Sequence, residues 1–114
     1  MIELHQRQCV ACKLMEPSLT SSEVEELNKK IPEWEVLNES GILKLRREYL
    51  FDDFISALDF TNQVGGMSES VNHHPDILTQ WGKVTLTWWS HKIKGLHLND
   101  FIMAAKSDVL FHSS

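Results

Sequence analysis

Residues 77–91 read Ile-Leu-Thr-Gln-Trp-Gly-Lys-Val-Thr-Leu-Thr-Trp-Trp-Ser-His, two runs of β-branched and aromatic residues separated by Gly82. Such residues favour strands, and a glycine between two extended runs favours a tight turn. We therefore expect an antiparallel hairpin with strands at 77–81 and 83–91. Side chains alternate along a strand, so one face of the second strand carries Val84, Leu86 and Trp88. The other face carries Thr85, Thr87, Trp89 and His91. This less apolar face is available either to a flat ligand or to a second subunit.

A second hairpin is expected upstream of the first. Trp34 and Val36 alternate with glutamates, and residues 38–41, Asn-Glu-Ser-Gly, are typical of a turn. Beyond that turn, apolar and aromatic residues recur at period two, at Leu43, Leu45, Tyr49 and Phe51. The sequence thus predicts four strands joined as two hairpins.

Three helices are expected around these hairpins. The first is predicted at 22–30, behind the hydroxyl groups of residues 20–22 and ahead of Pro32. The second begins after Asp52 or Asp53 and ends before Pro75, and we expect Gly65-Gly66 to bend or fray it. Its predicted apolar stripe comprises Phe54, Ile55, Leu58, Val64, Met67 and Val71. The third is predicted at 98–111, with Leu98, Phe101, Ile102, Ala105 and Val109 directed inward.

The order of these elements defines a fold class. Amphipathic helices between antiparallel hairpins predict an α+β fold in the order α-β-β-α-β-β-α, with a four-stranded antiparallel sheet covered on one face by helices. A chain of 114 residues with 42% hydrophobic content fits one domain. We expect an N-terminal tail at 1–19 and a folded domain at 20–114.

Charge and composition exclude several classes of function. The formal net charge of -5 argues against nucleic-acid binding, because phosphate affinity comes from clustered Lys and Arg. The first residues lack the pattern of a signal peptide, and no apolar run approaches the roughly 20 residues of a membrane span. We therefore expect a cytoplasmic protein without membrane contact.

The two cysteines, Cys9 and Cys12, form a C-x-x-C pair near the N-terminus. Such a pair can be a redox couple or half of a zinc site, but zinc would need two further ligands, and His5 is the only other nearby candidate. We interpret the pair as reduced thiols on the tail.

Adjacent histidines form the sharpest local motif of the chain, in Glu69-Ser70-Val71-Asn72-His73-His74-Pro75. His73, His74, His91 and His97 could in principle bind a metal, but neighbouring side chains diverge and would not easily share one ion. Histidine exchanges protons near neutral pH, so acid/base chemistry suits the pair better. The spacing alone leaves structural roles open, in which His74 satisfies backbone groups in a turn and His91 caps a strand end.

The spacing of these residues resembles the signature of the pterin-4a-carbinolamine dehydratase family. Glu69 is followed by His73-His74-Pro75, then by Trp81, His91 and Asp100. The resemblance extends over most of the chain, through the Cys9-x-x-Cys12 tail, Trp34, Phe51-x-x-Phe54 and Gly95-Leu96. It makes 20–114 a pterin carbinolamine dehydratase domain with a four-stranded antiparallel sheet and helices on one face.

The resemblance also implies an activity and a site. Family members remove water from 4a-hydroxytetrahydropterin, which aromatic amino-acid hydroxylases release, to give quinonoid dihydropterin. His73, His74 and His91 would line the pterin pocket, with Glu69, Asn72 and Asp100 as supporting substrate-binding groups. The implied enzyme is a hydro-lyase that needs neither metal nor cofactor. It would form a homo-oligomer, with a dimer favoured, and have a functional link to phenylalanine hydroxylase. The alternative is a binding or assembly module on the same fold, similar to a dimerisation cofactor.

Two positions depart from the family pattern. His97 stands where threonine is usual, and because histidine is a poorer helix cap, we expect the last helix to begin at Asn99 instead. Gly65-Gly66 replaces stronger helix formers in the helix that presents Glu69 and the histidine pair.

Overall fold

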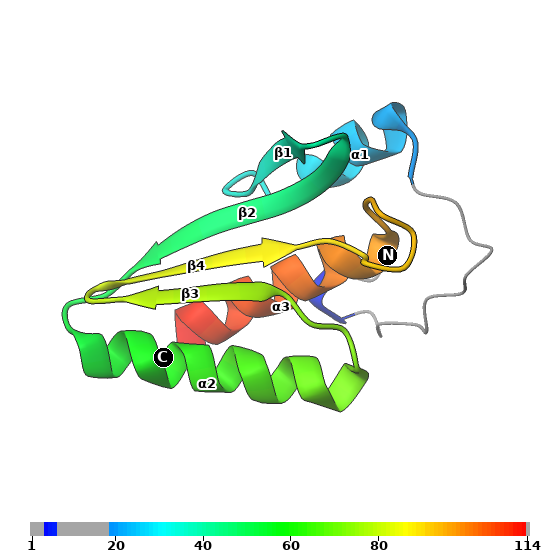
Figure 1. Ribbon diagram of the computed structural model, residues 1–114. Coiled ribbons are helices and arrows are strands. Elements are labelled where there is room, and N and C mark those ends of the chain that lie inside the picture. Colours follow the sequence, from blue (N-terminus) through cyan, green and yellow to red (C-terminus); the bar gives the residue numbers. More distant parts are fainter. Residues whose placement is uncertain (1–3, 7–18, 114) are drawn as a thin grey trace.

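The computed structural model describes residues 4–6 and 19–113, and Figure 1 shows their arrangement. Its elements are η1 (Leu4–Gln6), α1 (Ser21–Asn28), β1 (Glu35–Glu39), β2 (Ile42–Leu50), α2 (Phe54–Val71), β3 (Asp76–Gln80), β4 (Lys83–Trp88) and α3 (Leu98–Ser113). After the short η1 turn, the order is the predicted α-β-β-α-β-β-α. No helix within this described part of the chain is long and apolar enough to cross a membrane.

The four strands form one antiparallel sheet in the order β1-β2-β4-β3. Each predicted hairpin is present, and the central contact is between β2 and β4, where Leu45 lies opposite Trp88 and Tyr49 opposite Val84. The first hairpin turns at Ser40 and Gly41, which both have positive φ. The predicted fold class is therefore confirmed.

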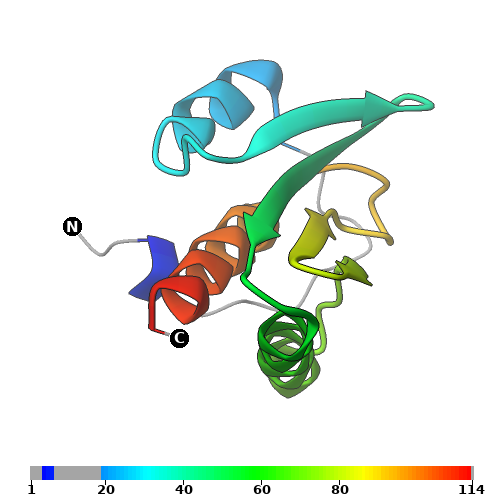
Figure 2. The same cartoon turned by 90° about the vertical axis from the view of Figure 1, so that its left-hand side faces the viewer.

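One face of the sheet forms the core. Leu45 and Tyr49 of β2 and Val84, Leu86 and Trp88 of β4 are buried, and α2 and α3 pack against these strands (Figure 2). Residues that alternate with them, such as Arg46, Glu48 and Thr85, remain partly or fully exposed. The alternation predicted for β4 holds for Val84, Leu86 and Trp88, which face the helices, although Thr87 on the opposite face is also buried.

The first helix begins with a capping box. Thr20 Oγ1 accepts a hydrogen bond from the Glu23 N–H at 3.2 Å, and Glu23 Oε1 accepts one from the Thr20 N–H at 2.8 Å. These reciprocal contacts satisfy two backbone groups that a helix start leaves free. Upstream of α1, the side chain of Leu4 is buried in the core, so residues 4–6 of the predicted tail contact α3. Cys9 and Cys12 lie outside the described residues.

The second helix corrects two expectations. It continues through Gly65-Gly66 without interruption, and Asp53 caps its start by accepting from the Ser56 N–H at 2.8 Å. The predicted stripe is wrong in its first turns, because Phe54, Ile55 and Leu58 are exposed. The face buried against the sheet consists of Ala57, Phe60, Val64 and Ser68. The first turns of α2 are apolar on more than one face, and periodicity alone could not select the inner one.

Replacing Gly66 by alanine is expected to stabilise the protein. A Cβ at this helical position meets no atom within 4 Å, and alanine is favoured over glycine in a helix interior by about 0.5–1 kcal/mol. Urea unfolding should show that the free energy of unfolding rises by about 0.5–1 kcal/mol. Gly82→Ala is the opposite control, because Gly82 has φ +72° and a Cβ there would lie 3.1 Å from the Phe51 carbonyl oxygen. Equal effects of the two changes would contradict this account.

The predicted bounds of β4 and α3 also need correction. β4 ends at Trp88 rather than at His91, because Ser90 pairs with Gly95 and the chain turns between them. α3 begins at Leu98, as first predicted, and not at Asn99, the later start expected from His97. Within α3, Val109 is exposed rather than directed inward, since the neighbouring Asp108 side chain takes the position that faces the sheet.

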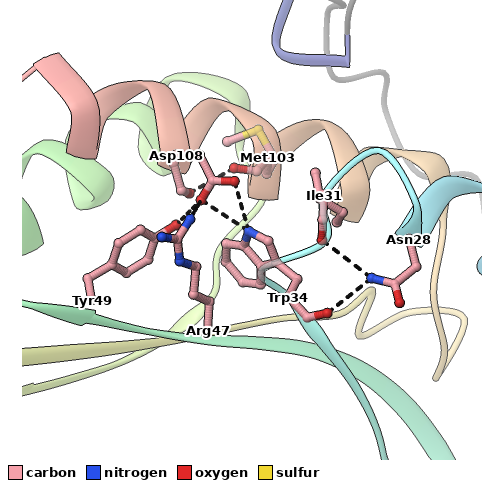
Figure 3. A network of polar contacts seen from close by, with 8 residues as sticks. Asn28, Ile31, Trp34, Arg47, Tyr49, Met103 and Asp108 are labelled. Atoms are coloured by element: carbon pink, nitrogen blue, oxygen red, sulfur yellow. Dashed lines mark hydrogen bonds and ion pairs between the residues drawn. The ribbon is translucent and has the colours of Figure 1, made fainter.

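Asp108 forms a polar cluster that joins α3 to the sheet, and Figure 3 shows it from close by. Its carboxylate accepts hydrogen bonds from the Tyr49 hydroxyl at 2.5 Å, Arg47 Nη1 at 2.7 Å and Trp34 Nε1 at 3.1 Å. Burial, with the adjacent Asp108 charge, raises the pKa of the Tyr49 hydroxyl. One carboxylate thereby ties residues of the first hairpin to the last helix.

Candidate active site

Four element ends meet at one end of the sheet: the C-terminus of α2, the start of β3, the end of β4 and the start of α3 (Figure 1). The pairing of Asp76 with Thr87 brings the start of β3 beside the end of β4. All six predicted site residues lie on these ends or on the loops that leave them. They are Glu69, Asn72, His73, His74, His91 and Asp100.

Asn72 ends α2 and directs the chain toward the histidine pair. Its backbone is left-handed, with φ 54° and ψ 41°, a conformation that asparagine adopts more readily than most residues. The His73 N–H donates back to the Ser68 carbonyl at 3.2 Å, which closes the helix end. Asn72 therefore has a clear structural role in placing the two imidazoles.

His73 is the more enclosed of the pair. Its Nε2 lies 2.7 Å from Asp100 Oδ1, and 11% of its side chain is exposed. Its ring stacks on Trp88 at 5.7 Å between centroids, with 10° between the planes. A hydrogen bond at one nitrogen and an indole at one face fix the position of this imidazole.

Asp100 holds three segments together from a fully buried position. Besides His73, its carboxylate accepts from the Ser90 hydroxyl at 2.7 Å and from the His97 backbone N–H at 2.9 Å. A buried carboxylate is tolerated only with such partners. It therefore links the α2–β3 junction, the end of β4 and the start of α3.

His97 caps the start of α3, although histidine was expected to be a poor helix cap at this position. Its Nδ1 accepts from the Asn99 N–H at 3.1 Å, while Asp100 accepts from the His97 N–H. The two contacts are the reciprocal arrangement of a capping box, with an imidazole nitrogen in place of a hydroxyl. This is why the helix begins at Leu98.

His74 forms a second, more exposed histidine–carboxylate pair. Its Nε2 lies 2.6 Å from Glu69 Oε1, and the two side chains are 52% and 79% exposed. Among the described residues, the His74 side chain makes no hydrogen bond to a backbone group. The structural alternative, in which His74 satisfies backbone groups in the turn, is therefore not supported. The pair instead presents an imidazole toward solvent beside His73.

His91 stands apart from these two pairs. It lies in the turn after β4, is exposed, and stacks on Trp89 at 3.9 Å between centroids with a 24° interplanar angle. Within residues 4–6 and 19–113, no hydrogen bond or ring contact joins His91 to His73 or His74. The structure thus brings His73 together with Asp100 and His74 together with Glu69, and it places His91 on a tryptophan.

This arrangement suits proton transfer. A carboxylate that accepts the Nε2 proton fixes one imidazole tautomer and leaves the Nδ1 lone pair available as a base. His73 and His74 each have such a partner. In the described part of the chain, no three His, Cys, Asp or Glu side chains are grouped as metal ligands.

Sequence reasoning missed Trp88 and Ser90 as supports of the site. Trp88 was correctly assigned to the core face, but nothing in one sequence indicated that His73 would stack on it. Ser90 was not considered, although a hydroxyl directly before His91 could have signalled a local polar contact.

The fold and the candidate site define a small α+β protein with two histidine–carboxylate pairs at one end of its sheet. The model of the family described as Pterin 4 alpha carbinolamine dehydratase matches residues 17–110. A protein from Nitrosococcus oceani, with the provisional name pterin-4-alpha-carbinolamine dehydratase, is 51% identical over 110 residues, covering 96% of this chain and 97% of the relative. The chain therefore belongs to the pterin-4a-carbinolamine dehydratase family.

Solved structures agree with the fold. A crystal structure described as a transcriptional coactivator/pterin dehydratase from Brucella melitensis matches with a TM-score of 0.75 and 28% identity, covering 82% of this chain and 97% of that one. A pterin dehydratase-like protein described as a RuBisCO assembly factor in the alpha-carboxysome matches with a TM-score of 0.60 and 21% identity, covering 71% and 92%. The second likeness concerns the fold alone.

Proposed function

We propose that this protein dehydrates 4a-hydroxytetrahydropterin to quinonoid dihydropterin, and so recycles the pterin cofactor of an aromatic amino-acid hydroxylase. The observation that carries the proposal is the enclosed His73–Asp100 pair in a chain of this family. A bound metal or cofactor has no part in the proposed reaction.

The reaction needs two proton transfers. The C4a–O bond breaks as the hydroxyl receives a proton and leaves as water. N5 loses its proton, and an electron pair on N5 forms the new double bond to C4a. His73 and His91 exchange these protons, and His74 orients the pterin. Asp100 fixes the tautomer of His73, and Glu69 does the same for His74, as their short contacts support. Asn72 contributes to binding by placing the two imidazoles.

The proposal extends to partners and location. We place the protein in the cytoplasm with the hydroxylase it would serve, for which phenylalanine hydroxylase is the candidate. A homodimer is supported by the exposed apolar side chains of Phe54, Ile55 and Leu58 on α2, because apolar groups gathered on one surface favour association. Light scattering measures the mass directly, and a monomer at micromolar concentration would contradict the dimer.

The test of the function generates the carbinolamine chemically and follows its dehydration by ultraviolet absorbance. The purified protein is expected to accelerate the reaction well above its spontaneous rate, with a rate proportional to protein concentration. Boiled protein gives the baseline. If the folded protein leaves the rate at the spontaneous value, the enzymatic proposal fails, and the alternative of an assembly module on this fold becomes the better account.

A further inference from the structure

We propose that Trp89 is a positioning residue for His91 and that Lys44 and Glu39 hold Trp89 in place. The inference rests on the proposed function, in which His91 exchanges a proton with the substrate. It assigns a role to three residues that are not part of the family signature.

His91 depends on stacking for its orientation. His73 and His74 each have a carboxylate partner at 2.7 and 2.6 Å. Within residues 4–6 and 19–113, the His91 imidazole makes no hydrogen bond or ion pair, and its side-chain contact is the Trp89 ring at 3.9 Å. An exposed imidazole on a turn would otherwise sample several rotamers. The indole selects the plane of the His91 ring while leaving both ring nitrogens free for proton transfer.

Trp89 is held from β2. The Lys44 ammonium lies 4.4 Å from the centroid of the Trp89 ring, a distance at which a cation is attracted to an indole face. Lys44 is itself fixed, because its side chain is only 14% exposed and its Nζ lies 3.0 Å from Glu39 Oε1. The indole is therefore restrained by a charged group that cannot easily move away.

Glu39 is the anchor of this set. Its carboxylate binds Lys44 through one oxygen and Arg46 through the other, both at 3.0 Å. Hydrogen bonds from Lys44 and then Arg46 hold the pKa of the Glu39 carboxyl below its ordinary range. Arg46 in turn donates from Nε to the Thr87 hydroxyl at 2.9 Å on β4. The contacts thus run from the first hairpin through Trp89 to His91.

Ring stacking, rather than a hydrogen bond from the indole N–H, accounts for the presence of a tryptophan at position 89. Trp89 Nε1 is buried and has no hydrogen-bond partner among residues 4–6 and 19–113, which is unfavourable for a polar group. Phenylalanine would fill much of the same space without that cost. Indole, however, offers a broader stacking surface and the strongest attraction for a cation. Trp89 makes both of these ring interactions, and it also packs against the hydrophobic core.

The consequence for catalysis is specific. A proton moves efficiently only when donor and acceptor lie within hydrogen-bond reach, and small misplacements can cost about 10²-fold in rate. Loss of the indole should therefore lower kcat more than it changes KM, because it disturbs a proton-transfer group rather than the bulk of the binding surface.

The experiment compares Trp89→Leu, Trp89→Phe and Lys44→Met with the wild type in two measurements. In the dehydration assay, Trp89→Leu is expected to lose about 10- to 100-fold in kcat with KM within threefold, and Trp89→Phe to keep most of the rate. Lys44→Met should lose about two- to fivefold, the equivalent of a cation–π contact at the weak end of the usual range. Lys83→Met is the matched control, since Lys83 pairs with Glu48 and has no contact with Trp89.

The second measurement is the NMR signal of the His91 Hε1 proton, assigned by its loss in His91→Gln. Stacking on an indole shifts this signal upfield, so Trp89→Leu should move it downfield and Trp89→Phe should move it less. An unmoved signal in Trp89→Leu would overturn the stacking, and a wild-type kcat in folded Trp89→Leu would overturn the positioning role. If Trp89→Leu does not fold, Trp89→Phe decides on the stacking, since an unmoved His91 signal would overturn it, and Lys44→Met decides on the positioning role, since a wild-type kcat would overturn it. If the wild-type protein does not accelerate dehydration above the spontaneous rate, the proposed function itself is rejected. The NMR shift would still decide whether His91 stacks on Trp89.

Discussion

His73→Ala is expected to lower kcat for carbinolamine dehydration by about 10²- to 10⁴-fold, the range typical of a lost general acid or base. Of the three histidines, His73 is the one whose position is fixed from two directions, by Asp100 at 2.7 Å and by the face of Trp88. The residual rate should still exceed the spontaneous one, because His74 and His91 remain. The measurement is the ultraviolet assay at saturating substrate, with kcat and KM determined separately.

A second histidine provides the control for this variant. His112 lies exposed in the last turn of α3, with Phe111 as its aromatic neighbour, so His112→Ala should keep the wild-type rate. Folding of His73→Ala is checked by circular dichroism, and we expect it to be retained because Asp100 keeps its contacts with Ser90 and His97. A folded His73→Ala with wild-type kcat would remove His73 from the mechanism.

The fold was predictable because its strongest signals are local. The alternation of Val84, Leu86 and Trp88 identified the inner face of β4, and all three are buried. Gly82 located the turn of the second hairpin, where its φ is +72°. Patterns of this kind depend on strand and turn geometry alone, so they required no knowledge of the tertiary structure.

The errors occurred where tertiary packing overrides a local pattern. Extending the β4 alternation to His91 failed because Ser90 pairs with Gly95 and turns the chain. The first turns of α2 carry apolar residues on several faces, and only contact with the sheet selects Ala57 and Phe60. His97 caps α3 because Asp100 and Asn99 complete the contacts around it.

The sequence could predict which residues would lie near one end of the sheet, but not how they would pair. The residues that the resemblance assigned do gather at one end of the sheet. Which carboxylate faces which imidazole depends on the left-handed turn at Asn72 and on the entry of α3. A single sequence does not encode those angles in any local pattern, so Glu69 and Asp100 could not be matched to their histidines beforehand.

Asp108→Ala is expected to destabilise the fold by about 3 kcal/mol, the largest stability effect we foresee for a residue outside the site. Its carboxylate satisfies the Tyr49 hydroxyl, Arg47 and the Trp34 N–H together. Removing one partner from an enclosed charge pair typically costs about 3–5 kcal/mol. Asp108 and Arg47 keep 20% and 15% of their side chains exposed, so the lower end of that range applies.

Urea unfolding followed by tryptophan fluorescence measures this loss, and Asp59→Ala is the matched control. Asp59 is an exposed aspartate on α2, and changes at exposed positions without specific contacts usually stay within about 0.5 kcal/mol. The stability loss of Asp108→Asn should lie between those of Asp108→Ala and Asp59→Ala. The amide oxygen of asparagine still accepts a hydrogen bond but no longer compensates the Arg47 charge. Asp108 lies outside the candidate site formed around His73, His74 and His91. Folded Asp108→Asn should therefore also keep the wild-type kcat. A stability loss no larger than that of Asp59→Ala would mean that the cluster contributes little to joining α3 to the sheet.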